Sequence, residues 1–128
     1  MAPMLPTFLQ VALGGAIGAT LRWALGLALL RGLGPTAFPL PVLTANVAGS
    51  LAMGAFVVVA GQRGWGNVTP FVTTGLLGGF TTFSAFSLET VTLIERGQIG
   101  PAALYVILSV ALSVGALWLG VAAMRAAL

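Results

Sequence analysis

The chain has 128 residues, of which 59% are hydrophobic and only 5% are charged, and its mean hydropathy is +1.09. A soluble domain carries about 25% charged residues, so this composition indicates an integral membrane protein. Cysteine and histidine are absent, which excludes disulfides and histidine-ligated metals. The net charge of +3 comes from five arginines and two acidic residues, and the arginines are scattered singly, so we expect no nucleic-acid partner.

The length accommodates about four spans of ~20 residues with short connections and little else. It therefore predicts one four-helix transmembrane domain over residues 1–128, embedded in the lipid bilayer. We expect the spans at about residues 6–30, 40–60, 70–94 and 99–124, separated by loops that contain glycine or proline.

The first span contains Gly14 and Gly18 in GxxxG spacing. Small residues at this spacing allow membrane helices to approach closely, so we interpret the pair as ordinary packing. Arg22 lies toward the end of the same span, where it either reaches the interface or faces the bundle as a structural or anion-attracting charge. Glu89 is the only acidic residue inside a span, and we expect both charged residues to be structural.

The second and fourth spans each carry polar residues on one helix face. Asn46 and Ser50 are four residues apart, and an asparagine in a lipid-embedded helix either finds a hydrogen-bond partner on another helix or lines a polar path. Tyr105, Ser109 and Ser113 recur every four residues and form one stripe about 12 Å long.

The third span contains a predicted break near residues 78–84. Gly78 and Gly79 are weak helix formers that each cost about 1 kcal/mol relative to alanine, and the Thr-Thr-Phe-Ser run that follows offers hydroxyls to the freed backbone. Unwound backbone at membrane depth survives only where protein or a water-filled cavity covers it. The break is therefore a site hypothesis, the alternative being a simple kink. Phe83 and Phe86 lie on one face just after it, and their alternative role is core packing.

The arginines are distributed evenly between the two sides of a four-span topology. Arg63 and Arg125 fall on one side, and Arg31 and Arg96 on the other, so the positive-inside rule has almost nothing to act on. This balance predicts insertion in both orientations and an antiparallel, dual-topology homodimer. The alternative is insertion in a single orientation, which a small difference in positive charge between the two sides decides.

The polar inventory favours permeation over catalysis. No nucleophile–base pair and no carboxylate pair is present, so we expect no enzyme. Hydroxyl and amide donors can replace the water around a small anion, and the positive edges of phenylalanine rings can also face it. A path that has no fixed cation binds an anion weakly enough to release it.

The third span also resembles a known signature. GGFTTFSAFSLE at residues 78–89 resembles the signature of the Fluc fluoride channels, also called the CrcB family. LTANVAGS at 43–50 resembles that family's second-span motif, and GGAIGA at 14–19 with the following Arg-Trp pair resembles its first-span pattern. The resemblance covers nearly the whole chain. Ala85 and Leu117 depart from it, at positions where members carry threonine or continue the polar stripe.

The resemblance implies a fluoride-specific ion channel that lowers cytoplasmic fluoride by passive export across the cell inner membrane. It implies a dual-topology homodimer with two antiparallel pores, in which phenylalanines from opposite subunits line each pore. It also implies a structural Na⁺ at the dimer centre, not transported, held by the backbone carbonyls of Gly78 and Thr81 from both copies. The expected fluoride pathway contains Asn46, Phe83, Ser84, Phe86, Tyr105, Ser109 and Ser113.

Two rival functions remain at this point. A small multidrug-type antiporter also has four short spans, but it needs a membrane-embedded acid in the first span, and this chain has none there. A non-conducting assembly subunit explains the small-residue faces but not the polar break. Ion flux from purified protein in liposomes separates all three.

Overall fold

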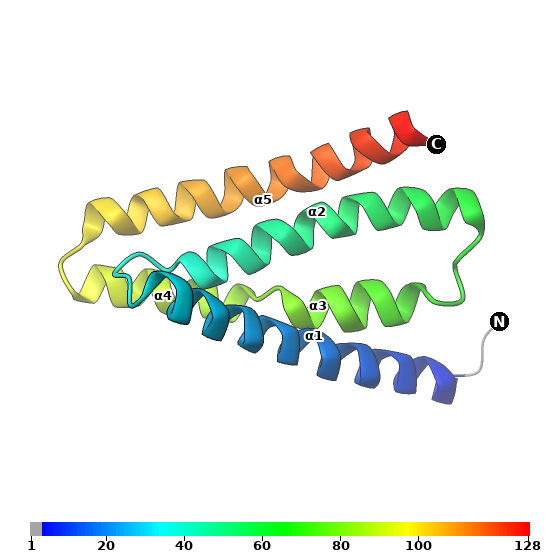
Figure 1. Cartoon of the computed structure of the whole chain (residues 1–128), viewed down its shortest axis with the longest axis horizontal. Helices are drawn as coiled ribbons and strands as arrows, with labels where there is room; N and C mark the ends of the chain where they lie inside the picture. The colour runs from blue at the N-terminus through cyan, green and yellow to red at the C-terminus, as the bar shows by residue number, and fades with distance from the viewer. Residues whose placement is uncertain (1–3) are drawn as a thin grey trace.

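A computed structural model describes residues 4–128 as a bundle of long helices that run alternately up and down (Figure 1). The third span consists of a π-helix, a short helix and a longer helix in succession. Within the described residues, four helical segments are long and apolar enough to cross a membrane, which confirms the expected four spans. The elements are α1 (Met4–Leu33), α2 (Leu40–Arg63), η1 (Pro70–Leu77), α3 (Gly78–Phe80), α4 (Phe83–Glu95) and α5 (Ile99–Ala127).

The first two helices extend by about one turn into the segments that we expected to be loops. α1 ends at Leu33, and Gly34 follows it with φ +74°. α2 ends at Arg63, and Gly64 caps it in the left-handed conformation, donating its N–H to the Ala60 carbonyl. Glycine adopts this conformation without steric cost, so the true ends of both helices lie at these glycines.

Glycines allow two pairs of helices to pack closely. On α1, a Cβ added to Gly14 or Gly18 would overlap the main chain of η1, and a Cβ on Gly79 would lie 2.7 Å from the Gly15 carbonyl oxygen. On the other side of the bundle, a Cβ on Gly54 of α2 would overlap the Leu117 carbonyl of α5. The packing interpretation of the first-span glycines is therefore confirmed.

The third span is interrupted, as expected, but not at the glycine pair. Gly78 is helical, with φ −63° and ψ −38°, and the chain leaves the helix at Thr81 and Thr82, whose ψ angles are 157° and 121°. Gly79 is needed for close approach to α1, whereas the β-branched threonines are suited to extended backbone. The predicted break near residues 78–84 is therefore confirmed, and it lies at the threonines and not at the glycines.

The small core lies at the end of the bundle near the α4–α5 connection. Leu93 and Tyr105 are the largest side chains that are almost completely buried, and they pack with Leu43 and Ala102. Large apolar side chains elsewhere point outward, as Trp118 and Ile107 do on α5. Outward apolar side chains suit a lipid environment, so the chain is a multi-pass membrane protein.

Candidate functional site

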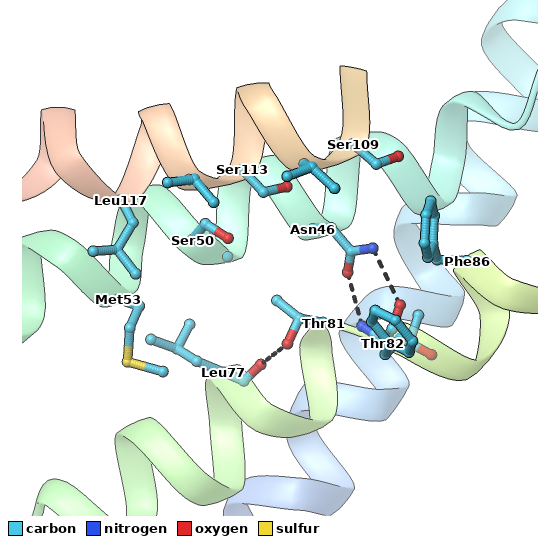
Figure 2. A pocket seen from close by; sticks show the side chains of 14 residues that line it. Asn46, Ser50, Met53, Leu77, Thr81, Thr82, Phe86, Ser109, Ser113 and Leu117 are labelled. Atoms are coloured by element: carbon cyan, nitrogen blue, oxygen red, sulfur yellow. Dashed lines mark hydrogen bonds between the residues drawn. The ribbon is translucent and has the colours of Figure 1, made fainter. Parts of the chain in front are cut away.

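The break in the third span is held by Asn46 of α2. The Asn46 Nδ2 donates to the Thr82 carbonyl at 3.1 Å, and the Thr82 N–H donates to the Asn46 Oδ1 at 2.8 Å (Figure 2). Thr82 Oγ1 in turn accepts the Ala85 N–H at 3.1 Å and caps α4. A side-chain amide and a hydroxyl thus satisfy the N–H groups of Thr82 and Ala85, which the interruption leaves without helical partners.

This arrangement withdraws the helical donors from two carbonyl groups. In a continuous helix the Thr82 N–H would donate to the Gly78 carbonyl, and the Ala85 N–H would donate to the Thr81 carbonyl. The Thr82 N–H goes to Asn46 instead, and the Ala85 N–H goes to Thr82 Oγ1. The carbonyl oxygens of Gly78 and Thr81 are therefore free to accept from another group.

A pocket of about 400 Å³ lies between α2, α5 and the break. Figure 2 shows Asn46 and Ser50 on one wall, with Ser109 and Ser113 of α5 beside them. The two threonines of the break and apolar side chains such as Leu117 complete the lining. The pocket brings together five of the expected pathway residues: Asn46, Phe83, Phe86, Ser109 and Ser113.

Hydroxyl groups on α5 are buried without partners. Among the residues whose side chains the structure describes, 6–128, the buried side-chain polar atoms that lack a hydrogen bond are Tyr105 Oη, Ser109 Oγ and Ser113 Oγ. Buried polar atoms are normally paired, so each exception requires an explanation such as a water or an ion. All three belong to the stripe that the sequence predicts, which makes the stripe a row of available donors.

The two phenylalanines occupy different environments. Phe83 is 80% exposed, whereas Phe86 is half-buried and its ring centroid lies 5.2 Å from that of Tyr105. The Phe83 and Phe86 centroids are 5.5 Å apart with the rings tilted by 58°. Ser84 is exposed, outside the pocket lining, with its Oγ 3.3 Å from Thr82 Oγ1. Phe86 therefore has a packing role within the chain that Phe83 does not have.

The two intramembrane charges lie away from this pocket. Arg22 donates from Nε to the Gly79 carbonyl at 3.3 Å, which connects α1 to the segment before the break. Glu89 lines a separate cavity of about 310 Å³ with Thr92 and Arg96 near the end of α4. The structural role expected for both residues stays a prediction, and the Arg22 contact supports it.

Gln10 performs a related task that the sequence alone did not indicate. Its Nε2 donates to the Asn67 carbonyl at 3.0 Å, and its Oε1 accepts the Phe71 N–H at 3.3 Å. Gln10 therefore anchors the start of the segment between the second loop and the break, and Asn46 anchors its end. A lone glutamine in an apolar run was the available signal, because such a side chain needs a polar partner in lipid.

These features define a class of protein. The third of four apolar spans has a break that side chains hold in place, and a pocket beside the break offers hydroxyl donors and aromatic rings without a fixed charge. Such a site suits a membrane protein that passes a small solute. The chain belongs to the CrcB family, because residues 9–121 match the family described as "CrcB-like protein, Camphor Resistance (CrcB)".

Named relatives match nearly the full chain. A protein from Ruegeria sp. named "Fluoride-specific ion channel FluC" is 61% identical over 98% of this chain and 99% of its own length. A protein of the same name from Cereibacter sphaeroides is 54% identical, covering 95% of this chain and 97% of its own. Another from Rhodospirillum centenum is 48% identical over 93% of this chain and 95% of its own length. The expected family is confirmed, and these relatives are ion channels rather than enzymes or antiporters.

Proposed function

We propose that this chain conducts fluoride. The observation that carries the proposal is the row of buried, unpaired hydroxyls on α5, of which Ser109 and Ser113 line the pocket beside the break. Unpaired buried donors are costly when they are permanently idle. An anion that passes along the row would accept a hydrogen bond from each hydroxyl in turn. This role explains why no protein group accepts a hydrogen bond from these hydroxyls. The names of the relatives identify the anion.

The pocket also suits rapid release of the anion. No arginine lines it, and its polar groups are amide and hydroxyl groups of residues such as Asn46 and Ser50. Neutral donors replace part of the hydration shell without trapping the ion, which conduction requires. The edges of the Phe83 and Phe86 rings carry partial positive charge and add a further weak contact.

Efflux from liposomes tests the proposal. Purified protein reconstituted in vesicles loaded with potassium fluoride should release fluoride when a potassium ionophore is added, and matched vesicles loaded with chloride should retain their anion. The contrast follows because a small anion exploits close neutral donors better than a large one. Equal release of fluoride and chloride, or no release of fluoride, would overturn the proposal.

The functional unit that we propose is an antiparallel homodimer inserted in both orientations. The even distribution of arginines between the two sides supports dual insertion. The 80% exposed Phe83 at the mouth of the pocket supports a second copy, because a partner would complete the wall. A C-terminal tag should be accessible from both sides of the membrane, and crosslinking should give dimers. A tag found on one side only would contradict dual topology.

We also propose a structural Na⁺ at the dimer centre. The free carbonyl oxygens of Gly78 and Thr81 fit this role, because two copies would offer four oxygen ligands to a hard cation without any carboxylate. Neutral ligands favour a monovalent ion. Prolonged removal of Na⁺ should therefore weaken the dimer and lower fluoride flux together. Flux that is indifferent to Na⁺ removal would contradict the site while leaving the fluoride proposal intact.

The physiological role follows from the chemistry of fluoride. Fluoride enters cells as neutral HF and ionises in the cytoplasm, so a passive channel in the cell inner membrane lowers its concentration without ATP. Cells that lack the protein should accumulate fluoride in acidic medium, and expression of this chain should reverse that accumulation. If cells that express this chain accumulate as much fluoride as cells that lack it, the proposed role is wrong.

A further inference from the structure

The end of the bundle where α2 and α5 finish carries two arginines and no acidic side chain. Arg63 lies in the last turn of α2 and Arg125 in the last turn of α5. The two acidic side chains of the protein, Glu89 and Glu95, both lie on α4, which runs toward the opposite end of the molecule (Figure 1). No acidic side chain therefore neutralises the two arginines.

A groove of about 250 Å³ separates the same two helices at this end. Deeper in the membrane α2 and α5 are in contact, since a Cβ on Gly54 or Gly120 would overlap the opposite main chain. At Gly61, by contrast, an added Cβ would meet no atom within 4 Å. The groove is lined by Val57, Val58, Gly61, Gln62, Val121 and Arg125.

We propose that this groove binds one anionic phospholipid, with its headgroup phosphate on Arg125 and Gln62 and an acyl chain along the valines. The lining combines an apolar floor with a basic rim, which matches the two parts of a lipid. Basic pockets between transmembrane helices bind anionic headgroups, and the planar guanidinium suits a phosphate. A free phosphate ion would leave the valines exposed, so the groove selects a lipid.

Arg125 is the decisive residue of this site. The C-terminal ends of α2 and α5 carry partial negative charge from their helix dipoles, which disfavours a phosphate at this position. Arg125 lines the groove and supplies the compensating charge, whereas Arg63 is exposed outside its lining. Removing either arginine changes the net charge equally, so the two residues form a matched pair for an experiment.

Native mass spectrometry of the full chain in detergent tests the proposal, with added phosphatidylglycerol, phosphatidylcholine or inorganic phosphate as probes. Wild-type protein and the Arg63→Gln variant should retain phosphatidylglycerol, and Arg125→Gln should bind it about fivefold more weakly. Phosphatidylcholine should bind weakly to all three. Equal loss in both variants, or equal binding of the two lipids, would overturn the proposal.

A second variant removes the groove and keeps every charge. Gly61→Leu places a side chain into open space, so it fills the groove without disturbing the α2–α5 contact, and the helix itself gains from the loss of glycine. It should reduce phosphatidylglycerol binding, while Gly32→Leu, an equally open position at the other end of the bundle, should not. Unchanged lipid binding by Gly61→Leu, or displacement of lipid by equimolar inorganic phosphate, would show that the groove is not a lipid site.

Discussion

The carboxamide of Asn46 pairs with the peptide of Thr82 through both of its polar ends, at 3.1 Å and 2.8 Å. One side chain from α2 thereby satisfies the N–H and the C=O of a residue that has left the helix. The same pairing occupies the N–H that would otherwise return to the Gly78 carbonyl. A single amide therefore stabilises the break and exposes a carbonyl beside it.

Replacing Asn46 should damage both stability and flux. An aspartate keeps the acceptor for the Thr82 N–H but loses the donor to the Thr82 carbonyl, and it adds a negative charge to the pocket. We expect Asn46→Asp to lower the free energy of unfolding by about 1–3 kcal/mol and to stop fluoride efflux. The measurements are the thermal loss of monodisperse protein and liposome efflux, with the exposed Thr44→Ala as control. Wild-type efflux from the aspartate variant would contradict this account.

Removal of the α5 hydroxyls should separate stability from function. Because Ser109 Oγ and Ser113 Oγ are buried and unpaired, Ser→Ala at either position removes a desolvated group and should leave stability unchanged or raise it by up to about 1 kcal/mol. Fluoride flux should fall in the same proteins. Ser87→Ala is the control, because its hydroxyl already donates to the Phe83 carbonyl. Lower stability with normal flux would show that the serines are structural.

Two variants separate the hydroxyl of Tyr105 from the packing of its ring. Tyr105→Phe deletes the unpaired hydroxyl but keeps the aromatic packing against Phe38 and Phe86, whose centroids lie at 5.6 Å and 5.2 Å. We expect normal thermal stability and reduced fluoride efflux, since only the donor is lost. Tyr105→Leu should lower both, because aromatic pairs contribute about 0.5–1.5 kcal/mol beyond buried area. Full flux from Tyr105→Phe would remove this residue from the pathway.

The two phenylalanines should respond differently to Phe→Ile. At Phe86 the change breaks the contact with Tyr105, so we expect reduced stability together with reduced flux. At Phe83, which is 80% exposed in the chain, the change should reduce flux with little effect on stability in detergent. Phe8→Ile, another exposed phenylalanine on α1, serves as control. Normal fluoride conduction by both pocket variants would mean that the rings act only in packing.

The glycine contact between α2 and α5 should be intolerant of a single methyl group. In Gly54→Ala the new Cβ would overlap the Leu117 carbonyl, so the helices must separate at a cost of about 1–3 kcal/mol. The displacement moves the serine row of α5 relative to Asn46, and flux should fall as well. Gly115→Ala on α5 meets open space and should be neutral. Equal thermal stability of the two variants would contradict the packing.

The sequence was sufficient for features that depend on local pattern. Apolar runs of span length predicted four helices within a few residues, because in lipid a spanning segment must satisfy its own backbone. The four-residue spacing of Tyr105, Ser109 and Ser113 placed them on one helix face, because an α-helix has about 3.6 residues per turn. The character of the polar pocket also followed from composition, since few other polar side chains were available.

Only the tertiary structure decided where the third span breaks and what holds it. The sequence predicted a break near residues 78–84, but contact with the main chain of α1 requires Gly79 to lack a side chain, and within that range the chain leaves the helix at Thr81 and Thr82. The partners Asn46 and Gln10 lie 36 and 57 or more residues from the main-chain groups that they bind. No local pattern encodes such pairs, because the energy of a buried amide depends on which backbone group the neighbouring helix presents to it.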